Sequence, residues 1–246
     1  MLEPTTTYVL AVLFAATLIR STLGFGEALV AVPLLALRIP VSVAAPLAVL
    51  VSVVVAAIIV AQDWRRIEVR SAVWLLAAAL PGIPLGLLLL TQVNDRIVKL
   101  ILGLIIIAFS SYSLAAKGRF HLLRDHGGML LGCGFCSGIL GGAYGMNGPP
   151  LAVYGTLRRW SPQHFRATLQ GYFLPASLLG LAGYAALGLW GAEVTRYFLV
   201  SLPGVLAAIF LGRALNHRVS GNGFLRMTYG GLILIGAVLL IQAYTG

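Results

Sequence analysis

The sequence has 246 residues, of which 59% are apolar and 10% are charged, and its formal net charge is +10. A soluble domain carries about 25% charged residues and could not bury this much apolar surface. The composition therefore argues against a soluble enzyme, a nucleic-acid-binding protein and a disulfide-stabilised scaffold. It indicates a chain that lives in a lipid bilayer, with enough apolar residues for about six to eight spanning helices of roughly 20 residues each.

Short polar connectors divide the chain into apolar runs, and none of these connectors is long enough to form a soluble domain. The runs cover residues 8–38, 41–61, 71–90, 97–116, 127–157, 167–190, 196–212 and 224–244. No basic residue precedes the first run, so no cleaved signal peptide is expected. The pattern predicts an all-α polytopic membrane protein with about eight membrane segments.

Two of the runs, 8–38 and 127–157, are too long for one untilted span. Glycine and proline interrupt both of them, at Gly24-Phe25-Gly26-Glu27 and at Gly145-Met146-Asn147-Gly148-Pro149-Pro150. Such residues break a helix. Each run therefore either crosses the membrane once as a kinked helix or enters and returns as a hairpin of two short helices.

The order of one broken run followed by three plain runs occurs twice. A shift of 121 residues aligns Gly24 with Gly145 and Arg38 with Arg159. We therefore predict two homologous membrane repeats, residues 1–118 and 119–246, within one integral membrane domain.

The basic residues distinguish the two topologies, because cytoplasmic connectors are enriched in lysine and arginine. If each broken run returns, one face holds twelve basic residues, namely Arg65, Arg66, Arg70, Lys117, Arg119, Arg124, Arg158, Arg159, Arg166, Arg213, Arg218 and Arg226. The other face then holds Arg38, Arg96, Lys99 and Arg196. Single crossings split the same residues seven to nine. The hairpin topology is favoured, and it inverts the two repeats and puts both termini on the non-cytoplasmic side.

Inverted repeats with discontinuous helices are typical of secondary transporters, which bind their substrate near the midplane. The second helix of each hairpin would begin near Gly26 or Gly148, and a helix N-terminus attracts anions. Glycine also lets a ligand approach the backbone closely. We predict a small-anion site lined by Gly24, Gly26, Gly145, Asn147, Gly148 and Pro149. Two alternatives stay open, since the glycines also suit close helix packing and Asn147 also suits a helix cap.

Arg20 and Glu27 are the charges inside the first hairpin, and an ionisable residue at membrane depth suggests function. Arg20 would attract an anion. Glu27 would carry a coupling proton, because burial favours the uncharged form of a carboxyl group. The alternative is a structural ion pair between the two.

Other polar residues give weaker signals. Gln170 and Tyr144 are added to the predicted site, although an interhelical hydrogen bond explains Gln170 equally well and packing is the more common role for a residue such as Tyr144. Cys133 and Cys136 are expected to be a buried apolar pair rather than a metal or redox site. The four histidines lie in connectors without a ligand or triad spacing, so no metal and no cofactor is expected.

The two break motifs resemble those of the sulfite exporter TauE/SafE family. Residues 24–35 are similar to its N-terminal glycine-rich motif and residues 141–150 to its second-half motif, while Arg166-Ala167-Thr168 and Pro203-Gly204 also fit. The resemblance implies an inner-membrane permease for small anions, often sulfur-containing, such as sulfite or a sulfonate. Family members often carry glycine where this chain has Glu27.

The predicted function is therefore a secondary transporter, an exporter of sulfite, a sulfonate or a related organic anion, working by alternating access and driven by an ion gradient, with Glu27 as the proton carrier, or by the anion's own gradient. The chain has no ATP-binding motif. A passive anion channel is the alternative. A membrane-embedded enzyme is less favoured, because no cluster of His, Asp and Glu lies at membrane depth. The expected partners are the anion, protons and the bilayer, and no nucleic acid.

Overall fold

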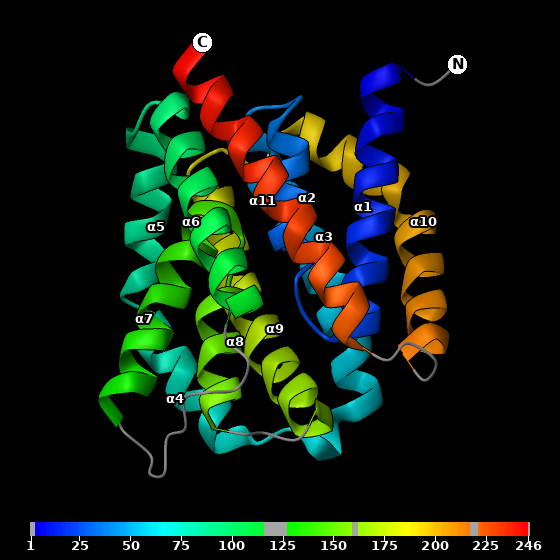
Figure 1. Cartoon of the computed structure of the whole chain (residues 1–246), viewed down its shortest axis with the longest axis vertical. Helices are drawn as coiled ribbons and strands as arrows, with labels where there is room; N and C mark the ends of the chain where they lie inside the picture. The colour runs from blue at the N-terminus through cyan, green and yellow to red at the C-terminus, as the bar shows by residue number, and fades with distance from the viewer. Residues whose placement is uncertain (1–2, 116–126, 159–161, 217–220, 246) are drawn as a thin grey trace.

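The computed structural model describes residues 3–115, 127–158, 162–216 and 221–245. Within these residues the chain forms eleven α-helices and one short 3-10 helix, and no strand, which confirms the all-α prediction (Figure 1). The helices are α1 (Pro4–Leu23), α2 (Glu27–Ala36), α3 (Val41–Asp63), α4 (Val69–Ala79), α5 (Gly82–Gln92), α6 (Asp95–Ala115), α7 (Gly127–Tyr144), α8 (Gly148–Leu157), α9 (Pro162–Ala186), α10 (Ala192–Asn216) and α11 (Gly221–Thr245). The 3-10 helix, Trp64–Arg66, joins α3 to α4.

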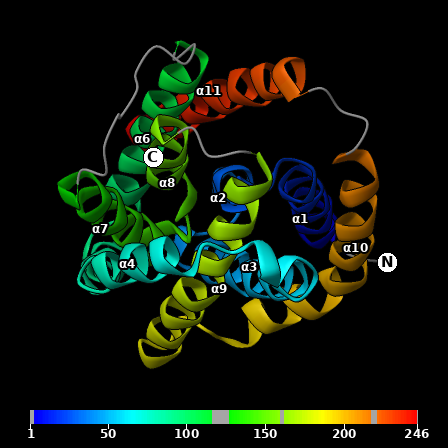
Figure 2. The same ribbon diagram turned by 90° about the horizontal axis from the view of Figure 1, so that it is seen from below.

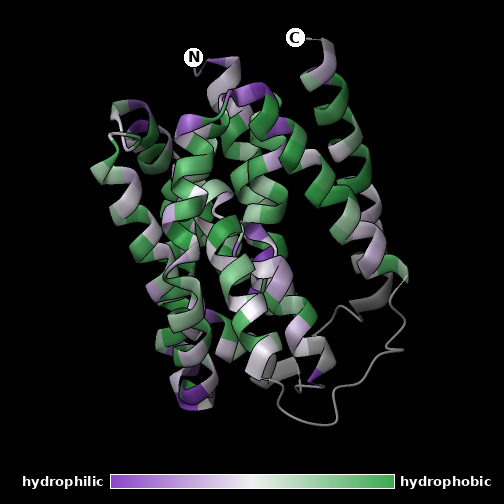
Figure 3. Ribbon diagram, turned by 90° about the vertical axis from the view of Figure 1, so that its left-hand side faces the viewer, coloured by the Kyte–Doolittle hydropathy of each residue, from purple (hydrophilic) through white to green (hydrophobic). Residues whose placement is uncertain are grey.

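Among the described residues, five helices are long and apolar enough to cross a membrane, namely α1, α3, α6, α7 and α10. A sixth span is available if α4 and α5, which meet at 45°, act as one broken span. In Figure 3, hydrophobic residues, drawn in green, occur along most of the length of the helices. Helices α2 and α8 have 10 residues each, so at about 1.5 Å per residue they are too short to span a hydrocarbon core of about 30 Å.

Both broken runs form hairpins. The hydroxyl of Tyr8, near the start of α1, donates to the carbonyl oxygen of Leu34, near the end of α2, at 2.6 Å. Helix α2 therefore runs back along α1, and α8 likewise returns beside α7 (Figure 1). The structure thus has the returning topology that the basic residues favoured.

Glycines with left-handed backbone make these reversals. Gly24 and Gly26 have φ angles of 90° and 98°, and Gly145 has 66°. Residues with a side chain adopt this region at a cost of about 1–2 kcal/mol, whereas glycine does so freely. Pro149, by contrast, lies in the first turn of α8, where the missing N–H group breaks no helical hydrogen bond.

Other glycines pack helices together. A side chain at Gly138 would meet the backbone of Ala79 in α4, and one at Gly142 would meet the backbone of α5. The glycines within α7 thus allow close packing of helices, which was one of the two explanations left open. The glycines of the breaks with positive φ instead allow the chain to turn.

The start of α1 and the end of α11 lie at the same end of the bundle (Figure 1). Two of the four basic residues that were assigned to the face with fewer basic residues are held at this end by polar contacts. Arg196 lies 3.5 Å from the carboxylate of Glu3, and Arg96 donates to the carbonyl oxygen of Tyr244 at 2.6 Å. This grouping is the one the hairpin topology requires, and its orientation relative to the cytoplasm stays a prediction.

The two predicted repeats pack through matching pairs of helices. Helix α1 packs on α10, and α7 packs on α4 and α5, so each hairpin lies against the second plain run of the other half. Helices α3 and α9 pair across the middle, and α6 pairs with α11 (Figure 2). The inverted relation of the halves stays a prediction that this reciprocity favours.

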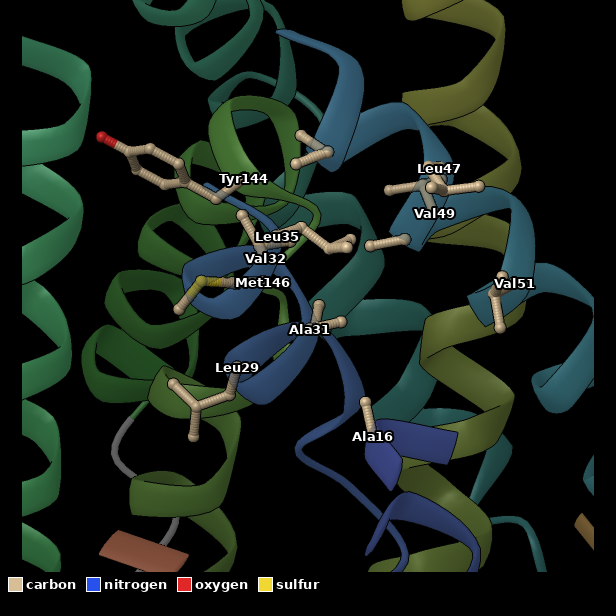
Figure 4. Packing of buried hydrophobic residues seen from close by; sticks show 14 of the residues in the cluster. Ala16, Leu29, Ala31, Val32, Leu35, Leu47, Val49, Val51, Tyr144 and Met146 are labelled. Carbon is tan, nitrogen blue, oxygen red and sulfur yellow. The ribbon is translucent and has the colours of Figure 1, made fainter. Parts of the chain in front are cut away.

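Helix α2 lies in the centre of the bundle. Ala31, Val32 and Leu35 are completely buried. They pack near α3 and near Met146 of the second break (Figure 4). A broken helix leaves backbone groups that lipid cannot satisfy, and this burial within protein keeps the first break away from lipid.

Candidate functional site

The two breaks meet at a buried cavity of about 20 Å³. Its lining comes from the end of α1, both breaks, the starts of α2 and α8, and the middle of α3 and α9. The lining residues are Arg20, Gly26, Glu27, Ala28, Leu29, Ser52, Gly145, Met146, Asn147, Gly148, Pro149 and Phe173. The sequence motifs from the two halves, more than a hundred positions apart, thus form one site.

Arg20 is the centre of a hydrogen-bond network across four helices. Its Nη1 pairs with the carboxylate of Glu27 on α2 and donates to Ser52 Oγ on α3 at 2.7 Å. Its Nη2 donates to Gln170 Oε1 on α9 at 2.7 Å. The guanidinium also lies 5.3 Å from the ring centre of Phe173, within the range of a cation–π contact.

The carboxylate of Glu27 is bound by the groups that would also bind a substrate anion. Its carboxylate accepts hydrogen bonds from Arg20 and, at 3.0 Å, from Thr17 Oγ1. It also opens α2, where the helix dipole favours negative charge. The side chains of Arg20 and Glu27 are 3% and 1% exposed. The ion pair left open as an alternative therefore exists, and both of its members also line the cavity.

Helix α9 of the second half holds the first break in place. Gln170 Nε2 donates to the carbonyl oxygen of Gly24 at 2.6 Å, which satisfies a backbone group that the break exposes. Ser177 Oγ of α9 is also hydrogen-bonded to Ser52 Oγ of α3, at 3.3 Å. Gln170 thus makes the interhelical hydrogen bond that was left open as the alternative to ligand contact, and it joins Arg20 to the break.

Among the residues that the structure describes, two buried polar atoms of the cavity's lining residues have no hydrogen-bond partner. They are Nε of Arg20 and Oδ1 of Asn147, whose residues are 3% and 5% exposed. Buried polar atoms are nearly always paired, so an unpaired one calls for a ligand, a water or a functional reason. Arg20 and Asn147 thus bring one unpaired donor and one unpaired acceptor to the residues of the lining, although Asn147 Oδ1 itself packs against Gly141 of α7.

The two helix N-termini at the site are not equivalent. The first N–H groups of α2 have no partner inside the helix, and the space beside Gly26 is open. Helix α8 begins Gly148-Pro149-Pro150, and its two prolines carry no N–H group. Backbone donors for an anion therefore come mainly from α2.

Most of the predicted site residues reach the cavity, and three do not line it. Gln170 is hydrogen-bonded to Arg20, which lines the cavity, and Gly24 is hydrogen-bonded to Gln170. Tyr144 is fully buried and donates to the carbonyl oxygen of Val98 on α6 at 3.0 Å, which is the packing role. The expected burial of the cysteines is wrong, since Cys133 is half-buried and Cys136 is exposed on α7.

Sequence reasoning missed Ser52, Phe173 and Thr17. Ser52 had a signal, because it interrupts the very apolar run 41–61, and Ser177 similarly interrupts 167–190. Phe173 had none, since an aromatic residue in an apolar helix is ordinary.

A bundle of apolar helices with two returning hairpins that meet at a buried, charged cavity is typical of polytopic membrane transporters. Comparison with known proteins makes the class specific. The model of the sulfite exporter TauE/SafE family matches residues 8–239, and the chain belongs to this family. It is 27% identical to the "Probable sulfite/organosulfonate exporter TauE" of Cupriavidus necator over 239 residues, which cover 95% of this chain and 93% of that protein. No solved structure matches the chain.

Proposed function

We propose that this protein is a secondary transporter that exports a small sulfur oxyanion, sulfite or an organosulfonate. Family membership and the name of the Cupriavidus relative support this substrate class. The observation that carries the proposal is the cavity at the paired breaks, where a buried arginine and a buried asparagine each keep an unpaired polar atom.

The proposed binding site uses Arg20, the start of α2 and Asn147. An arginine fork matches two oxygens of an oxyanion, and the N–H groups of α2 add fixed positive dipole. Gly26, Gly145 and Gly148 keep the backbone close to the ligand. A cavity of about 20 Å³ has room for about one water molecule, which needs roughly 10–15 Å³. Substrate entry therefore requires the breaks to separate.

Glu27 occupies the place that we assign to the substrate anion. Its carboxylate takes the donors that an oxyanion would take, namely Arg20 and Thr17, at the N-terminus of α2. Two anions beside one buried arginine would repel each other strongly at low dielectric. We propose that Glu27 is protonated when the anion binds, so that one proton is coupled to one anion.

Alternating access would follow from the two halves. Each hairpin packs on the second plain run of the other half, so a rocking of one half against the other would open the cavity toward alternate faces. We propose an inner-membrane location with both termini on the non-cytoplasmic side, on the strength of the twelve basic residues assigned to the opposite face.

A counterflow assay tests the carrier mechanism. Purified protein in proteoliposomes loaded with unlabelled sulfite should take up labelled sulfite against its gradient, and the rate should saturate. Loading with an organosulfonate should do the same if it shares the site. A conductance that does not saturate and shows no counterflow would overturn the proposal in favour of a passive channel.

A further inference from the structure

A second, larger cavity lies where α4 and α7 begin and α8 ends. Its volume is about 370 Å³, within the range of about 300–1,000 Å³ typical of ligand sites. The lining residues are Glu68, Arg70, Ser71, Trp74, Gly127, Leu130, Leu131, Tyr154 and Arg158. None of them lines the central cavity.

The polar wall of this cavity is positive. Arg70 and Arg158 outnumber Glu68, the acidic residue of the lining. Gly127 is the first residue of α7 and has open space beside it. The first N–H groups of a helix have no partner inside it and attract negative charge. These features favour an anionic group.

The opposite wall is apolar and faces outward. Trp74 and Leu131 are 56% and 51% exposed, and in a membrane-spanning bundle such side chains face lipid. Tryptophan is enriched where the hydrocarbon meets the headgroups. The cavity thus joins a basic polar wall to a lipid-facing apolar wall.

The linings of the two cavities share no residue and border the same apolar cluster. Leu151 of α8 and Leu75 of α4 are completely buried, and they belong to one apolar cluster with Phe173, which lines the central cavity. Leu130 of the second cavity packs against the same cluster. A ligand in the second cavity would therefore bind without contact with Arg20.

We propose that the second cavity binds an oxyanion attached to an apolar body. Arg70 and Arg158 hold the oxyanion, and Trp74 and Leu131 contact the apolar body. The phosphate of an anionic phospholipid and the sulfonate of an amphiphilic sulfonate share this chemistry. The inference does not depend on the transport activity, because it concerns binding at residues outside the central site.

Trp74 itself reports occupancy. A variant with Trp64, Trp160 and Trp190 replaced by phenylalanine keeps Trp74 as its single tryptophan. In phosphatidylcholine nanodiscs, brominated phosphatidylglycerol should quench Trp74 at a lower mole fraction than brominated phosphatidylcholine. Arg70→Gln should weaken the preference about fivefold or more, because it removes a charge-assisted contact with the phosphate in the cavity. Arg65→Gln, an equal change of charge at an exposed residue outside the cavity, loses only the general attraction of the surface and should weaken the preference clearly less than Arg70→Gln does.

A second arm distinguishes the source of the oxyanion. Hexanesulfonate added to phosphatidylcholine nanodiscs should shift Trp74 emission saturably if the free sulfonate binds, and Arg70→Gln should weaken that shift. A preference for brominated phosphatidylglycerol without any response to hexanesulfonate assigns the cavity to lipid. Equal quenching by both brominated lipids together with no response to hexanesulfonate would overturn the proposal. Helical circular dichroism of each variant shows that it remains folded.

Discussion

Arg20 and Glu27 form a buried ion pair across the first break, although Gly24 and Gly26 interrupt the helix between them. The pair forms because α2 turns back and brings its first residue to the end of α1. A buried pair is weak evidence for stability, since the desolvation of two charges offsets much of their attraction. Its place at the cavity makes substrate binding and proton coupling the more specific explanation, and the predictions below test this.

Replacing Glu27 by glutamine should remove the pH dependence of transport. Glutamine imitates the protonated carboxyl, so Arg20 would be available to the anion at every pH. The wild-type rate should fall as pH rises and Glu27 ionises, whereas the variant rate should stay constant. Methanesulfonate is the suitable substrate in proteoliposomes, because it keeps one charge across the pH range. A variant that retains the wild-type pH profile would refute the proton-carrying role.

Asn147→Asp should weaken substrate affinity. The new carboxylate would add a negative charge beside the anion, at a position that is 5% exposed. We expect KM for sulfite to rise about tenfold, the effect of ~1.4 kcal/mol. Asn94→Asp, at the start of α6 and outside the cavity lining, is the matched control and should leave KM unchanged. An unchanged KM in Asn147→Asp would remove Asn147 from the site.

Gly26→Ala should destabilise the protein through its backbone. The φ of Gly26 is 98°, and no atom lies within 4 Å of the added methyl group, so the cost is conformational, about 1–2 kcal/mol. Gly128→Ala in α7 also meets open space but has ordinary helical backbone, and it should be neutral or stabilising by up to about 1 kcal/mol. Thermal unfolding in detergent compares the two, and equal melting temperatures would contradict the assignment of Gly26 to the turn.

Gln170→Ala should destabilise the first break. The substitution removes the hydrogen bonds to Arg20 and to the carbonyl oxygen of Gly24, and unsatisfied buried groups cost about 1–3 kcal/mol. Gln62→Ala, at an exposed position, should change the free energy of unfolding by less than about 0.5 kcal/mol. Similar values for the two variants would show that Gln170 does not hold the break.

The hairpin topology could be predicted because charged residues have to stay in water, so their distribution reports the path of the chain. The turns at Gly24, Gly26 and Gly145 could be predicted because glycine is the residue that reverses a helix without strain. Arg20 and Glu27 stood out because charges are rare at membrane depth.

Other features depended on tertiary contacts that no local pattern reports. The partners of Arg20 on α3 and α9 lie 32 and 150 positions away along the chain. Burial of Cys136 was predicted wrongly because both the lipid-facing and the core-facing sides of a membrane helix are apolar. Hydrophobicity alone therefore does not distinguish the core-facing side of a membrane helix from its lipid-facing side.

The central claim is that Arg20 binds the transported anion when Glu27 is uncharged. Binding of labelled sulfite to purified protein should be measured for the wild type, for Glu27→Gln and for the double variant Arg20→Gln/Glu27→Gln, which leaves no unpaired buried charge. We predict tighter binding than wild type in Glu27→Gln and loss of binding in the double variant. Equal affinity in Glu27→Gln and the double variant would contradict the claim.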